Sequence, residues 1–85
     1  MDNTLKLIVL DWIPSQSKVI DFGCGDGALL KMLSEQKSII GYGVENDPDK
    51  INACIINGVS VIQQDIDAGI HNYKGMGFDV AEMAS

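Results

Sequence analysis

The stretch that most constrains the fold is VIDFGCGDGALL at residues 19–30, in which an apolar run ends in an acid and is followed by three glycines at every second position. A short run rich in β-branched residues is typical of a buried strand, and the Leu-rich segment behind it has helical spacing. Glycines between the two allow a sharp turn and let the backbone approach a ligand at the N-terminal end of a helix. The stretch therefore predicts a strand, a glycine turn and a helix in succession.

The flanking sequence predicts two more helices. One covers residues 3–13 and ends before Pro14. The other lies within residues 46–59, where Asp47 suits the N-cap, Pro48 the first helical position and Gly58 the C-terminal stop. With the helix at 28–37, these segments separate the apolar runs along the whole chain.

Strands are expected at residues 17–22, 38–45 and 59–65, and the start of a fourth from residue 78. Residues 66–77 are expected to form a loop with at most one helical turn. An order of α-β-α-β-α-β-loop-β predicts an α/β protein with a parallel, Rossmann-like sheet of three to four strands and flanking helices.

Acidic residues stand at the ends of three predicted strands, namely Asp21, Glu45 and Asp65. Because the carboxyl ends of parallel strands share one sheet edge, these side chains should meet beside the glycine turn. Asp21 could face a cationic amino acid moiety, and Glu45 could accept hydrogen bonds from both hydroxyls of a ribose. Asp65 could accept from an adenine amino group while the backbone of Ile66 meets the ring. Together they describe a nucleoside with a cationic tail.

Other interpretations of the same residues stay open. The glycines could form a structural turn without a ligand, and Glu45 or Asp65, taken alone, could be a helix cap or a solvated loop residue. With Ala28 in the third place, the turn also fits a nicotinamide dinucleotide fingerprint, although an acid at Asp21 would repel a diphosphate. Tyr42 could flank the adenine or pack between a strand and a helix.

Composition excludes several partners. The 85 residues include 12 acids and only 6 basic residues, all lysine, for a formal charge of −6, which disfavours nucleic acid. Asp2 and Asp11 interrupt the apolar N-terminal segment too early for a signal peptide or membrane span, so a cytoplasmic protein is expected. Cys24 and Cys54 show neither a disulfide framework nor metal-ligand spacing, so we expect reduced thiols and no metal site.

The motif Asp-x-Gly-x-Gly-x-Gly at residues 21–27, with Glu45 and Asp65, resembles the S-adenosylmethionine site of class I methyltransferases. More narrowly, the segments DWIP, VIDFGCGDGALL, GYGVENDPDKINACIINGVSVIQQDID and FD resemble the MetW family of methionine-biosynthesis proteins, over about residues 7–80. The resemblance implies S-adenosylmethionine as cofactor. For the turn around the methionine moiety, the resemblance implies the binding residues Asp21, Gly23, Cys24, Gly25 and Gly27. It implies Glu45 as the ribose contact, and Asp65 with Ile66 as the adenine contacts.

The resembled fold has more strands than this chain can supply. We therefore expect one partial domain over residues 1–85, in which residues 1–14 form an N-terminal helix and residues 18–80 the N-terminal Rossmann-like half. The acceptor-side residues of such enzymes usually follow the fourth strand, so no catalytic residue is assigned and the isolated chain is expected to be a truncated, catalytically incomplete relative.

Two functions follow from the resemblance and stay open. One is a methyltransferase-type domain linked to methionine biosynthesis. The other is a non-catalytic accessory subunit of a homoserine acyltransferase, an enzyme that the family suggests as a partner. An inactive fragment, with neither function, is the remaining alternative. Dimerisation could cover the open sheet edge beside the first strand.

Overall fold

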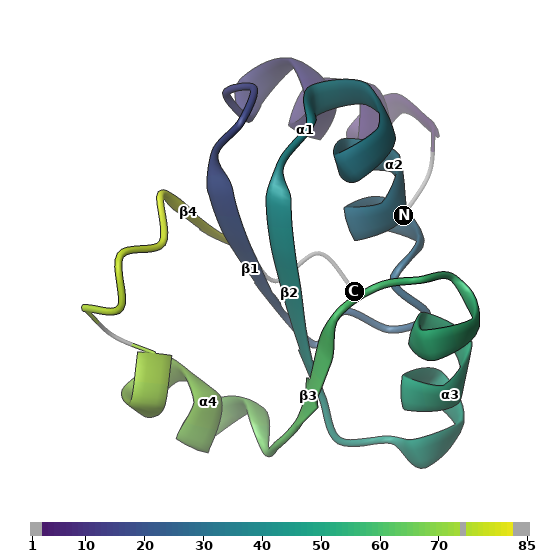
Figure 1. The fold of residues 1–85 in the computed structure, drawn as a ribbon, viewed down its shortest axis with the longest axis vertical. Coiled ribbons are helices and arrows are strands. Elements are labelled where there is room, and N and C mark those ends of the chain that lie inside the picture. The colour runs from purple at the N-terminus through teal and green to yellow at the C-terminus, as the bar shows by residue number, and fades with distance from the viewer. Residues whose placement is uncertain (1–2, 74, 83–85) are drawn as a thin grey trace.

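The computed structural model describes residues 3–73 and 75–82. Within them the chain alternates between helices and strands: α1 (Asn3–Trp12), β1 (Lys18–Phe22), α2 (Ala28–Lys37), β2 (Ile40–Glu45), α3 (Pro48–Ile56), β3 (Val61–Gln63), α4 (Ile66–Tyr73) and β4 (Val80–Glu82). The strands are parallel and form one sheet in the order β3-β2-β1-β4 (Figure 1). The predicted α/β class with a Rossmann-like parallel sheet is confirmed.

Helices cover both faces of the sheet, with α2 and α3 on one side and α4 on the other (Figure 1). Successive strand residues point to opposite faces, so Val19 joins Leu30, Leu33 and Cys54 in one apolar cluster. Its neighbour Ile20 belongs to a second cluster, with Phe22, Val44, Ile66, Tyr73 and Phe78. Burial on both faces explains why β1 is a continuous apolar run.

The predicted ends of α3 are confirmed. Asp47 is the N-cap, and its Oδ1 accepts a hydrogen bond from Asp49 N at 2.9 Å, with Pro48 as the first helical residue. Gly58 follows the C-cap with a φ of 73°, the left-handed conformation that glycine adopts most easily. Short-range signals were sufficient here because capping depends on a few adjacent residues.

The loop predicted at residues 66–77 is wrong over its first part, because Ile66–Tyr73 form the helix α4. Two features stabilise this helix. Asp65 Oδ1 accepts from Asp67 N at 2.9 Å and from Ala68 N at 3.4 Å, which caps the first turn. Ile66 and Tyr73, two turns apart, pack on the buried residues of β1 and β2.

The fourth strand begins at Val80 and lies beside β1. Its entry is fixed by paired bonds, since Lys18 N donates to Asp79 Oδ2 and Asp79 N donates to Lys18 O, both at 2.8 Å. The Lys18 ammonium also lies 4.6 Å from the centre of the Phe78 ring.

None of the helices in the described part of the chain is long and apolar enough to cross a bilayer.

Candidate functional site

The glycine turn between β1 and α2 is left-handed at all three glycines, with φ of 74° at Gly23, 61° at Gly25 and 79° at Gly27. The reasons for glycine differ between positions. A Cβ on Gly27 would lie 2.9 Å from Val59 Cγ2. The close packing of the turn against the α3–β3 connection therefore requires a residue without a side chain at position 27. A Cβ on Gly25 would meet nothing within 4 Å. Gly27 therefore has a structural role, whereas the backbone at Gly25 faces open space that a ligand can enter.

Glu45, the last residue of β2, lies directly against this turn. It is only 7% exposed, and its Oε1 accepts a hydrogen bond from Gly25 N at 3.0 Å. Its Oε2 accepts from Asn46 N at 3.0 Å and Asp47 N at 3.1 Å. Burial alone would raise the pKa of this carboxyl, but the backbone amides outweigh it and hold the pKa below its usual value. Glu45 is therefore a carboxylate at neutral pH.

Asp21 is the other buried acid near the turn. It is 2% exposed and pairs through its backbone with Gly43 of β2. By strand alternation its side chain shares the face of Val19, on the side of α2 and α3. Its charge is close enough to Cys24 to help raise the pKa of that thiol.

Asp65 and Ile66 lie across β2 from the glycine turn. The end of β3 is fixed beside Glu45, because Gln64 N donates to Glu45 O at 3.0 Å. The exposed Asp65 caps α4, and the side chain of Ile66 packs on the far face of the sheet. The structure thus brings Glu45 into contact with the glycine turn and places Asp65 farther along the same carboxyl edge.

Two buried thiols lie behind the turn. Cys24 Sγ and Cys54 Sγ are 3.6 Å apart, and Cys54 Sγ donates to Gly25 O at 3.0 Å. Both cysteines are free, and burial raises the pKa of both thiols, so they stay protonated at neutral pH. Cys24 also fits over Gly43, where an added Cβ would overlap its Sγ. Cys54 was not predicted as a site residue, because a spacing of 30 positions hides a contact that the docking of α3 creates.

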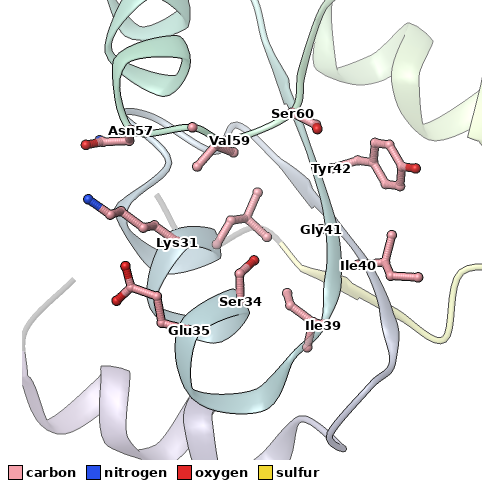
Figure 2. Close-up of a pocket in the computed structure, with 12 residues that line it drawn as sticks. Lys31, Ser34, Glu35, Ile39, Ile40, Gly41, Tyr42, Asn57, Val59 and Ser60 are labelled. Carbon is pink, nitrogen blue, oxygen red and sulfur yellow. The ribbon is translucent and has the colours of Figure 1, made fainter.

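A separate pocket of about 460 Å³ lies between α2 and the α3–β3 connection, toward the amino end of β2. Figure 2 shows Lys31, Ser34 and Glu35 on one side of it and Asn57, Val59 and Ser60 on the other. Tyr42 points away from the pocket and packs edge to face on Phe78, with ring centres 5.8 Å apart. This supports packing rather than an adenine contact for Tyr42.

In the described residues, no cluster of three or more His, Cys, Asp or Glu side chains could hold a metal ion.

Comparison with known proteins gives one family. The family described as methionine biosynthesis protein MetW matches residues 4–85. A curated relative, the bifunctional methionine biosynthesis protein MetXA/MetW of Rhodopirellula baltica, is 30% identical over 79 residues, which cover 84% of this chain and 13% of that protein.

Solved structures share the fold. A TehB-like SAM-dependent methyltransferase from Corynebacterium glutamicum superposes with a TM-score of 0.62 and 24% identity, over 71% of this chain and 33% of that one. A SAM-dependent methyltransferase from Geobacter sulfurreducens, solved with S-adenosyl-L-homocysteine, gives a TM-score of 0.61 and 21% identity, over 73% and 27%. The chain thus spans a third or less of these structures, and far less of the curated relative.

Proposed function

The chain belongs to the MetW family of methionine biosynthesis proteins, and we propose that its residues bind S-adenosylmethionine at the carboxyl edge of the sheet. The proposed binding unit is residues 18–80. In the described part of the predicted N-terminal segment, α1 packs on this unit through Val9 and Leu10. Because the chain spans only part of its relatives, methyl transfer itself is no part of this proposal.

The observation that carries the proposal is the contact between Glu45 and Gly25. A buried carboxylate lies 3.0 Å from the amide of a turn residue whose Cα faces open space. A carboxylate has about four acceptor positions, so beyond the three backbone amides Glu45 can accept from a hydroxyl. One hydroxyl of a ribose matches this remaining acceptor position, as in other Rossmann-like sites.

The other predicted residues support the same orientation of the ligand. Asp21 and the turn from Gly23 to Gly27 lie on the β1 side of Glu45, where a negative charge favours the ammonium group of a methionine moiety. Asp65 and Ile66 lie on the other side of Glu45, where the adenine would reach them. The cap of α4 uses Asp65 Oδ1, and a carboxylate can accept at both oxygens.

When bound, S-adenosylmethionine supplies an activated methyl group on its sulfonium. The residues of this chain bind and orient the ligand, and direct displacement at such a carbon depends mainly on alignment. Glu45 is proposed to accept a hydrogen bond from a ribose hydroxyl. No described residue is assigned a proton transfer.

A second candidate function is an accessory role toward an acyltransferase of methionine biosynthesis. The relative from Rhodopirellula baltica is, by its name, a bifunctional MetXA/MetW protein. In this chain α1 exposes large apolar side chains, with Leu7 65%, Ile8 51% and Trp12 84% exposed, as an interaction surface would. The two candidates are compatible, because a ligand-binding unit can also dock on a partner.

Calorimetric titration with S-adenosylmethionine, S-adenosylhomocysteine and NAD tests the proposal. We expect the first two to bind at one site and NAD to give no heat. Glu45→Gln should weaken binding about tenfold or more, because the ribose loses a charged acceptor. Glu35→Gln is the matched control, since Glu35 lines the separate pocket of Figure 2 and should leave affinity unchanged. Binding of NAD alone, or a loss confined to Glu35→Gln, would contradict the proposed site.

A further inference from the structure

We propose that the C-terminal part of α3 clamps the glycine turn through Cys54 and Asn57, and that this clamp sets the affinity of the turn for an adenosyl ligand. The inference rests on the proposed function and adds two positioning residues to it. Neither residue belongs to the glycine motif or to the acids at the strand ends.

Two successive carbonyls of the turn receive donors from this end of α3. Cys54 Sγ donates to Gly25 O, and Asn57 Nδ2 donates to Asp26 O, both at 3.0 Å. Cys54 is fully buried, whereas Asn57 is the C-cap of α3 and partly exposed. The two bonds join segments about 30 residues apart in the chain, so they hold the turn to a packed helix.

The Gly25 peptide is thereby held from both sides. Its N–H donates to Glu45 Oε1 at 3.0 Å. Its carbonyl accepts from Cys54 Sγ at 3.0 Å, while Cys24 Sγ makes a longer contact of 3.8 Å with the same oxygen. Glycine loses more conformational freedom on folding than any other residue, and Gly25 has no side chain to pack. The orientation of the Gly25 peptide therefore depends on the hydrogen bonds that its N–H and carbonyl groups make. The same bonds fix the position of Glu45 Oε1 beside Gly25.

The clamp requires a thiol that keeps its proton. Burial is the largest effect on the pKa of Cys54 and raises it, whereas the hydrogen bond with Cys24 lowers it. The negative charges of Asp26, Glu45 and Asp21 raise it again, and the net pKa lies above the ordinary value. Cys24 Sγ, 3.6 Å away, is the other thiol in contact with this group. Cys54 is consequently a neutral donor at physiological pH, which is the form that Gly25 O needs.

The decisive experiment measures S-adenosylhomocysteine affinity of the full chain carrying Cys54→Ala, Cys54→Ser or Asn57→Ala. We expect the two alanine variants to bind about three- to tenfold more weakly, the factor that corresponds to one lost neutral hydrogen bond. Cys54→Ser retains a donor and should recover much of the affinity. Ile39→Val is the control, because it removes one methyl group from the same apolar cluster, and Ile39 precedes β2 at the opposite end of that strand from Glu45.

Amide exchange of Gly25 in the ligand-free protein gives a second readout. The clamp predicts faster exchange in Cys54→Ala than in Ile39→Val. Unchanged exchange, wild-type affinity in both alanine variants, or equal weakening by Ile39→Val would overturn the clamp. If the wild-type chain binds no S-adenosylhomocysteine, the proposed function fails, and faster Gly25 exchange in Cys54→Ala would still support the clamp.

Discussion

Among single residues, Glu45 links the stability of the fold to its proposed function. Its carboxylate accepts from the amides of Gly25, Asn46 and Asp47, and so joins the glycine turn to the start of α3. The sequence indicated an acid at the end of a strand about 20 residues past the glycines, a spacing typical of ribose recognition. It could not indicate that the same carboxylate organises the turn in the ligand-free protein, because that contact depends on how β1 and β2 pair.

The pH dependence of stability tests this role. The pKa of Glu45 is lower in the folded protein than the usual value of 4.5, so its stabilising contribution is fully present above that value. The contribution is lost as the pH falls through the lowered pKa. We expect Glu45→Gln to reduce the free energy of unfolding by about 2 kcal/mol at pH 7, and this difference to shrink below about pH 4.5.

Denaturant unfolding of the two proteins at a series of pH values measures the effect. Glu35→Gln, which alters an exposed carboxylate on α2, serves as control and should change stability by less than about 0.5 kcal/mol. A difference between wild type and Glu45→Gln that stays constant from pH 7 to pH 3 would contradict an ionised, hydrogen-bonded Glu45.

At the scale of elements, local patterns predicted β1, the glycine turn, α2 and α3, whose signals lie within a few residues of each other. They failed for α4. Asp65 was assigned to the end of a strand as a ligand contact, although it also caps the helix that follows, and Gly69 lowers the helix propensity of that segment. The packing of Ile66 and Tyr73 on β1 and β2, which stabilises α4, is tertiary and has no local signal.

The dual position of Asp65 gives a prediction for α4. Asp65→Ala should destabilise the protein by about 1 kcal/mol through loss of the cap, whereas Asp65→Ser retains a cap and should restore stability. If Asp65 also binds the adenine, Asp65→Ser should still bind S-adenosylhomocysteine more weakly than wild type. Thermal melts and calorimetry on the same variants separate the two roles, and full recovery of both by Asp65→Ser would remove Asp65 from the binding site.

At the scale of the whole molecule, the carboxyl edge of the sheet and the pocket between α2 and the α3–β3 connection are separate places. The first combines the buried acids Asp21 and Glu45 with the glycine turn. The second has Lys31 and Glu35 at its side and Gly41 of β2 in its lining (Figure 2). The sequence predicted the first through its motif, but the second was not foreseen because it results from the spacing of two helices on the sheet.

The measurement that tests the central claim most directly is a crystal structure of the chain grown with S-adenosylhomocysteine. The account predicts that a ribose hydroxyl lies within hydrogen-bond distance of Glu45, with the homocysteine moiety against the turn at Gly25. Density for the ligand in the pocket beside Lys31 and Glu35, with Glu45 contacting only its backbone amides, would contradict it.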